Sequence, residues 1–133
     1  METLFDFQLG LELQARIGHT FRSISDTNLR RAERWHKGGL EEWTVLEWAG
    51  AMAGEAGEAA NVAKKLRRFD QGIHGATQYK AKRAELVAKL ASEIAGTFMY
   101  LDLLAQREGI DLRRAIVDEF NRVSEREGFP ERL

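Results

Sequence analysis

The fold of this chain is decided by the unbroken stretch over residues 44–66, which reads TVLEWAGAMAGEAGEAANVAKKL. Thr44 and Glu47 match a capping box, in which each side chain hydrogen-bonds to the backbone N–H of the other residue. Trp43 and Trp48 stand at the two positions of a hydrophobic staple around the same cap. The pattern therefore predicts a long helix that begins at Thr44.

The end of this helix is predicted at about Phe69, and a start near Glu41 is an open alternative at the other end. Its last turns are basic, which stabilises the negative end of the helix dipole, and residues 70–72 (DQG) then interrupt it. Small residues dominate one of its sides, so another helix can approach closely. These small or slender residues are Ala49, Met52, Ala53, Ala56, Ala59, Ala60 and Ala63.

Three further amphipathic helices are predicted from apolar residues that recur at three-to-four spacing. They are expected at about residues 20–35, 79–107 and 111–127, with Asp111 as the N-cap of the last. Proline occurs once in the chain, which favours such long elements. The sequence thus predicts an all-α bundle of about four helices, which we expect to be completed as a homodimer or homotetramer.

The first residues differ from the rest, because apolar and polar residues alternate over residues 5–14 (FDFQLGLELQ). A period of two predicts a half-buried strand, which would need a partner such as its copy in another subunit. An irregular arm or a short helix is equally open. The chain is therefore divided into an N-terminal arm over residues 1–19 and one helical domain over residues 20–133.

Composition limits the setting and the partners. The 133 residues suit a single domain, and the absence of cysteine excludes disulfides and thiolate zinc sites. No apolar run is long enough to span a membrane, and the N-terminus does not resemble a signal peptide, so we expect a cytoplasmic protein. The net charge of −1 gives no overall basic field, so no nucleic-acid polymer is expected, and an anionic ligand must be met by a local cluster.

Two carboxylates on the long helix are spaced for shared chemistry. Glu55 and Glu58 lie about 60° apart on a helix, and Asn61 and Lys65 continue the same side. Glu93 is the best facing candidate, since it is acidic within an otherwise apolar helix. Such carboxylates without His or Cys favour Mg²⁺ or Mn²⁺, which completes its shell with phosphates. Taken alone, an ExxE motif more often marks a solvated helix face.

Several motifs in order give a family resemblance. They are GEAGE at residues 54–58, EIAG at 93–96, YLDLLA at 100–105, RWH at 34–36 and FNRVSEREGFP at 120–130. Together they resemble the MazG-like all-α nucleoside triphosphate pyrophosphohydrolases, and the C-terminal motif looks like that of small, often phage-encoded members. The resemblance covers about residues 21–133.

The resemblance implies magnesium-dependent cleavage of a nucleoside triphosphate, expected to be a dNTP, into the monophosphate and pyrophosphate. The expected location is the cytoplasm, or the host cytoplasm if the protein is phage-encoded. Glu55, Glu58 and Glu93 match the metal-ligand positions, and Glu55 or Glu58 would act as the base. Gly96 stands where the family usually has a fourth carboxylate, an aspartate. The expected substrate-binding residues are Asn61, Lys64, Lys65, Asn121, Arg126, Asn28 and Trp35.

That departure at Gly96 leaves an alternative open. A protein that retains the nucleotide pocket but has lost efficient catalysis would be a nucleotide-binding or regulatory protein. Because magnesium is often held by one or two protein carboxylates plus substrate phosphates, three carboxylates are still expected to support activity.

Overall fold

The computed structural model describes residues 19–73 and 80–133, and every element in these ranges is helical. The elements are α2 (Phe21–Trp35), the 3₁₀ helix η1 (Gly39–Glu42), α3 (Val45–Asp70), α4 (Lys80–Arg107) and α5 (Leu112–Glu127). The predicted all-α class is confirmed, with four α-helices in the described part of the chain. The strand expected over residues 5–14 lies outside the described residues, as does the rest of the N-terminal arm except His19.

The capping signals in the sequence form as predicted. Thr44 Oγ1 accepts from the Glu47 N–H at 3.2 Å, and the Glu47 carboxylate accepts from the Thr44 N–H at 2.7 Å. The alternative start near Glu41 is wrong, because residues 39–42 form a separate 3₁₀ turn. Thr20 caps α2 and Asp111 caps α5 through hydrogen bonds from Ser23 N–H and Arg114 N–H.

Glycines end two of the helices. Gly109 follows α4 with φ 65° and Gly128 follows α5 with φ 73°, a backbone conformation that other residues rarely adopt. After Gly128, the Phe129 N–H donates to the Ser124 carbonyl at 2.8 Å, which satisfies a free carbonyl of the last turn.

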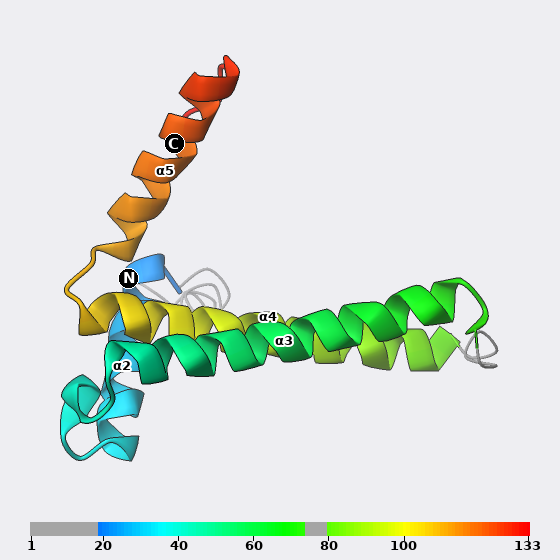
Figure 1. Cartoon of the computed structure of the whole chain (residues 1–133), viewed down its shortest axis with the longest axis horizontal. Coiled ribbons are helices and arrows are strands. Elements are labelled where there is room, and N and C mark those ends of the chain that lie inside the picture. The colour runs from blue at the N-terminus through cyan, green and yellow to red at the C-terminus, as the bar shows by residue number, and fades with distance from the viewer. Residues whose placement is uncertain (1–18, 74–79) are drawn as a thin grey trace, which may run out of the picture.

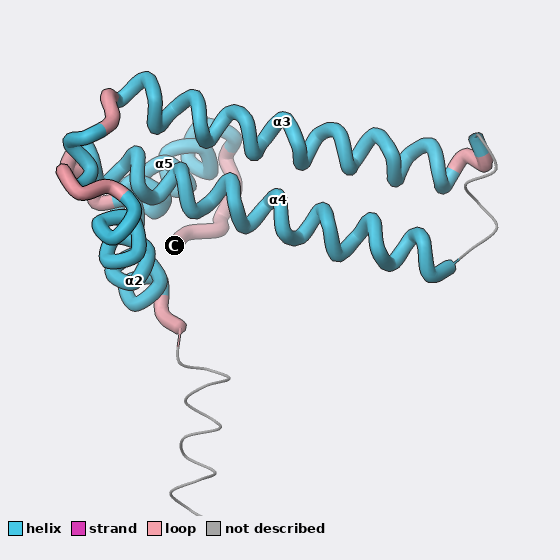
Figure 2. The backbone as a smooth tube through the Cα atoms, turned by 90° about the horizontal axis from the view of Figure 1, so that it is seen from below, coloured by secondary structure: helices cyan, strands magenta, loops and turns pink. Residues whose placement is uncertain are grey.

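The helices α3 and α4 form one long antiparallel hairpin, and α2 crosses one end of it (Figures 1 and 2). That junction holds a core around Trp48, Ala32 and Leu103, with Leu40, Trp43, Tyr100 and Leu104 packed against it. Trp48 is fully buried, and its indole N–H donates to the Leu40 carbonyl at 2.9 Å. The predicted staple is present, since the Trp43 and Trp48 rings lie 4.6 Å apart.

The last helix, α5, projects away from the hairpin at the junction end (Figure 1). Its apolar residues Ile116 and Phe120 are each 42% exposed. Part of the apolar face of α5 is thus left uncovered by the described part of this chain. None of the described helices is both long enough and apolar enough to cross a membrane.

Candidate functional site

The hairpin brings two of the predicted carboxylates together. Glu55 on α3 and Glu93 on α4 are both half-buried and within hydrogen-bond reach of each other. Burial raises the pKa of Glu55 above its ordinary value, and the hydrogen bond and charge of Glu93 and the charge of Glu58 raise it further. Two like charges that face each other in this way are stabilised by a proton or by a cation.

Gly96 makes this arrangement sterically possible. A Cβ built at Gly96 would lie 2.6 Å from Glu55 Oε2, closer than real Cβ contacts, and 3.0 Å from Glu55 Cδ, which is tighter than most of them. The carboxylate of Glu55 therefore fills the space beside the α4 backbone where a side chain at position 96 would begin. The same test finds nothing within 4 Å of a Cβ at Gly50, Gly54 or Gly57.

Glu58 is placed on the flank of this pair rather than between the helices. It is exposed on α3, one turn beyond Glu55, and close enough for its charge to act on the Glu55 carboxyl. Across the described residues, no three His, Asp or Glu side chains already stand in a metal-binding arrangement. Glu55 and Glu93 thus supply a preformed oxygen pair, and Glu58 would have to rotate to join it.

The donor chemistry of this pair fits a hard divalent cation. Carboxylate oxygens are the ligands that Mg²⁺ and Mn²⁺ prefer, and magnesium commonly uses one or two of them. Gly96 leaves the Glu55 carboxylate beside Glu93, so both would contribute oxygens from the two facing helices.

The predicted polar residues of α3 follow the carboxylates along the helix. Lys65 lies seven residues, almost two full turns, after Glu58 and so on the same side of α3. Both Lys64 and Lys65 are exposed, while Asn61 is half-buried. A phosphate chain that reached beyond Glu58 toward the end of α3 would therefore meet Asn61 and Lys65 first.

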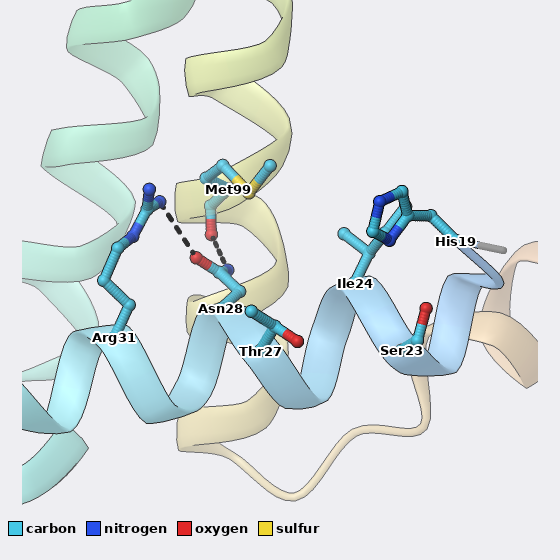
Figure 3. Close-up of a pocket in the computed structure, with 7 residues that line it drawn as sticks. All are labelled: His19, Ser23, Ile24, Thr27, Asn28, Arg31 and Met99. Carbon is cyan, nitrogen blue, oxygen red and sulfur yellow. Dashed lines mark hydrogen bonds between the residues drawn. The ribbon is translucent and has the colours of Figure 1, made fainter. Parts of the chain in front are cut away.

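A recess of about 310 Å³ lies between α2 and α4 (Figure 3). It is lined by His19, Ser23, Ile24, Thr27, Asn28, Arg31 and Met99. Met99 follows Gly96 by three residues, so the recess opens about one helical turn along α4 and about 60° around it. The recess and the contact of Glu55 with α4 are thus on neighbouring turns of α4.

Asn28 contributes a fixed hydrogen-bond acceptor to this recess. Its amide N–H groups donate to the Met99 carbonyl and to Asp102 Oδ2, each at 2.9 Å, which fixes the orientation of the amide. Its Oδ1 points the other way, toward the Arg31 guanidinium at 3.5 Å (Figure 3). The side chain is 4% exposed, so the packing around α2 holds this acceptor in place.

Asp102 is buried behind the recess, where it fixes the amide of Asn28. It is 1% exposed and accepts from the Ser25 hydroxyl at 2.6 Å, from Asn28 and from the Gln106 amide at 3.0 Å. It lies nine residues after Glu93, which puts it on the opposite side of α4, and its contacts tie α2 to α4. This carboxylate is therefore not available to replace the missing acid at Gly96.

Trp35 is 69% exposed at the end of α2, and the Arg31 guanidinium lies over its ring at 5.1 Å. Sequence reasoning had named Trp35 and Asn28 but had missed Arg31, the residue that links them. The signal was available, because Asn28, Arg31 and Trp35 recur at three-to-four spacing on one side of α2.

The two predicted residues on α5 are engaged locally. Asn121 donates to the Leu133 carbonyl at 3.2 Å and accepts from the Leu133 N–H at 2.9 Å, and Arg126 pairs with Glu127. Because α5 projects away from the hairpin (Figure 1), one chain does not bring Asn121 and Arg126 beside Glu55.

Comparison with known proteins gives no relatives. The chain matches no family model, no curated protein and no solved structure.

Proposed function

We propose that this protein is a divalent-metal-dependent nucleoside triphosphate pyrophosphohydrolase of the MazG-like kind, acting on a deoxynucleoside triphosphate. The observation that supports this most is the close approach of Glu55 and Glu93 across the hairpin, with Gly96 leaving room for the Glu55 carboxylate. Hard oxygen donors on facing helices are a common way for helical bundles to hold Mg²⁺ or Mn²⁺. When bound, such a cation neutralises phosphate charge and acts as a Lewis acid.

In this proposal Glu55 also acts as the general base. Its raised pKa makes it a better proton acceptor than an ordinary exposed carboxylate, provided that it is ionised at the working pH. It would take a proton from the water that attacks the α-phosphorus. The bond between the α-phosphorus and the bridging oxygen to the β-phosphate breaks, and pyrophosphate leaves. Glu58, on the flank, is the second candidate for this base.

The recess between α2 and α4 is proposed to take the base or sugar. Its volume suits one ring system, Asn28 Oδ1 offers an acceptor, and the Arg31 guanidinium offers a donor beside it. Lys65 and Lys64 would meet the phosphates on α3. Asn121 and Arg126 would take part only if α5 of a second copy packs on the hairpin, which accords with the exposed apolar face of α5.

The alternative is a nucleotide-binding or regulatory protein without efficient turnover. The observations that favour it are Gly96 in place of a carboxylate and the outward position of Glu58. Such a protein would bind nucleotides through the same recess and the same lysine side chains, but it would release no pyrophosphate.

One assay separates these functions. The purified chain is incubated with each common ribo- and deoxynucleoside triphosphate, with Mg²⁺, Mn²⁺ or EDTA, and the products are separated by ion exchange. Metal-dependent release of monophosphate and pyrophosphate is expected. The variant Glu93→Gln should lose at least 100-fold in kcat/KM, about the effect of removing one electrostatic group from an active site.

Glu85→Gln is the matched control, because Glu85 is an exposed acid on the same helix. It should retain the activity of the natural chain. Nucleotide binding without turnover would instead support the regulatory alternative. The absence of both binding and turnover would contradict both proposed functions.

A further inference from the structure

One half of the hairpin differs strongly in charge from the rest of the chain. Between Lys64 and Lys89 the sequence has eight basic and two acidic residues, a net charge of +6, so the remainder of the chain carries −7. The overall charge of −1 is therefore the sum of two large and opposite contributions. We call residues 64–89 the basic half of the hairpin.

The structure gathers these charges at one end of the molecule. The last turns of α3 and the first turns of α4 lie side by side at the end of the hairpin remote from α2 (Figures 1 and 2). The exposed cations of this half with described side chains are Lys64, Lys65, Arg67, Arg68, Lys82, Arg83 and Lys89. In the described part of this half, one ion pair forms, between Arg83 and Asp70 at 2.8 Å.

Helix stability explains only part of this cluster. Arg67 and Arg68 lie in the last turn of α3, where cations stabilise the negative end of the helix dipole. At the start of α4 the helix dipole is positive and favours acidic residues. The first turn of α4 nevertheless has no acidic residue, and its sequence is Lys80, Ala81, Lys82, Arg83. The cations in the first turn of α4 therefore oppose the stability of their own helix.

We propose that the basic half of the hairpin binds the phosphate backbone of a nucleic-acid duplex. A dense cluster of exposed Lys and Arg at the shared end of two adjacent helices is the feature that attracts a polyanion, through release of its counterions. Single strands are usually held by stacked aromatic rings, and the aromatic residue described in this half, Phe69, is buried. The net charge of −1 does not reveal this local positive field, and so the net charge alone predicts no nucleic-acid partner.

The cations at the far end of the basic half are separate from the carboxylate pair. Arg68 follows Glu55 by 13 residues, which places it about 20 Å further along α3. A duplex held by Arg67, Arg68 and Lys82 would therefore bind toward the far end of the hairpin, and this proposal does not depend on the hydrolase activity. Arg67, Arg68 and Lys82 are also outside the set proposed to bind the triphosphate.

The test measures binding of the full chain to a fluorescent 20-base-pair DNA duplex by anisotropy across a salt series. We expect micromolar binding at 50 mM NaCl that weakens steeply with salt. The triple variant Arg67→Gln/Arg68→Gln/Lys82→Gln should bind at least tenfold more weakly. The negative slope of log K against log salt should become shallower by about two to three.

The matched control is Arg113→Gln/Arg114→Gln/Arg132→Gln, which removes the same charge from exposed positions outside the basic half. It should bind within twofold of the natural chain, and circular dichroism should show that both variants stay folded. Equal losses in both variants, or no binding at 50 mM NaCl, would overturn the proposal. Tighter binding to a single strand or to anionic phosphatidylserine vesicles than to the duplex would also overturn it.

Discussion

The carboxylate of Glu55 occupies the space that a side chain at position 96 would need. Gly96→Ala should therefore push this carboxylate away from Glu93 while the fold persists, because the clash is with the far end of a flexible side chain. Alanine also gains about 1 kcal/mol in helix propensity over glycine. We expect an unchanged or higher melting temperature together with a tenfold or greater loss of Mn²⁺ affinity, measured by calorimetry.

Gly50→Ala provides the comparison, since a Cβ at Gly50 meets nothing within 4 Å on α3. It should give the same gain in helix stability and leave Mn²⁺ affinity intact. If Gly96→Ala bound Mn²⁺ as well as the natural chain, the position of the Glu55 carboxylate beside Gly96 would be irrelevant to the cation.

The pKa of Glu55 predicts how stability depends on pH. Because burial and the neighbouring Glu93 raise this pKa in the folded state, the folded chain holds its proton to higher pH than the unfolded chain. Stability is therefore lost as pH rises from the ordinary carboxyl pKa through the folded value. Glu55→Gln should increase the free energy of unfolding at pH 7, and the gain should vanish in acid. Urea unfolding between pH 4 and pH 8 measures this.

Glu47 should show the opposite sign. The hydrogen bonds from Thr44 lower the pKa of Glu47, so its contribution is present above the ordinary carboxyl pKa and is lost as pH falls through the folded value. Glu47→Gln should thus weaken the fold at pH 7. A gain in stability from this substitution at pH 7 would show that the capping box does not control the start of α3.

Substitution of Asp102 should lower the stability of the fold without altering the carboxylate pair. Asp102→Asn places a second amide among the donors from Ser25, Asn28 and Gln106, so at least one buried donor loses its acceptor. Such an orphaned group costs about 1–3 kcal/mol. Asp118→Asn, which removes an exposed pair with Arg114, should cost less than about 0.5 kcal/mol. Equal unfolding midpoints in urea for the two variants would contradict this account.

Two tryptophans separate folding from ligand binding. Trp48→Ala should destabilise the chain by about 3–5 kcal/mol, because Trp48 is fully buried in the junction core. Trp35→Ala should change stability by less than about 0.5 kcal/mol, because Trp35 is largely exposed. If the recess takes the nucleotide, Trp35→Ala should nevertheless weaken nucleotide binding in a titration. A Trp35 variant that binds nucleotides normally would place them elsewhere.

Local signals in the sequence were sufficient for the helices. The Thr44 capping box and the Asp111 N-cap set helix starts to the residue, because caps act through backbone groups three residues away. The facing of Glu55 and Glu93 was also predictable, since small residues on α3 allow α4 to approach. The caps depend on short-range geometry, which a sequence carries directly, and the facing of the two acids follows from the small residues that let the two helices of the hairpin pack closely.

The steric role of Gly96 and the recess beside it depend on packing between helices. In the sequence Gly96 is a missing carboxylate, and only the position of Glu55 on α3 shows what fills its place. Asn28 was predicted to reach the ligand, but its two hydrogen bonds to α4 depend on the angle at which α2 crosses the hairpin. The positions of Asn121 and Arg126 on a projecting helix could not be read from periodicity either.

The three tryptophans of this chain lie in three different surroundings: Trp48 in the core, Trp43 half-buried against it, and Trp35 at the surface beneath Arg31. An aqueous quencher such as acrylamide would reach Trp35 first, so the red-edge emission reports mainly on that residue. Because Arg31 also lines the recess, an occupant that draws the guanidinium away alters this emission while the buried indole stays constant. The molecule thus carries an intrinsic optical reporter for its own recess, with an internal reference.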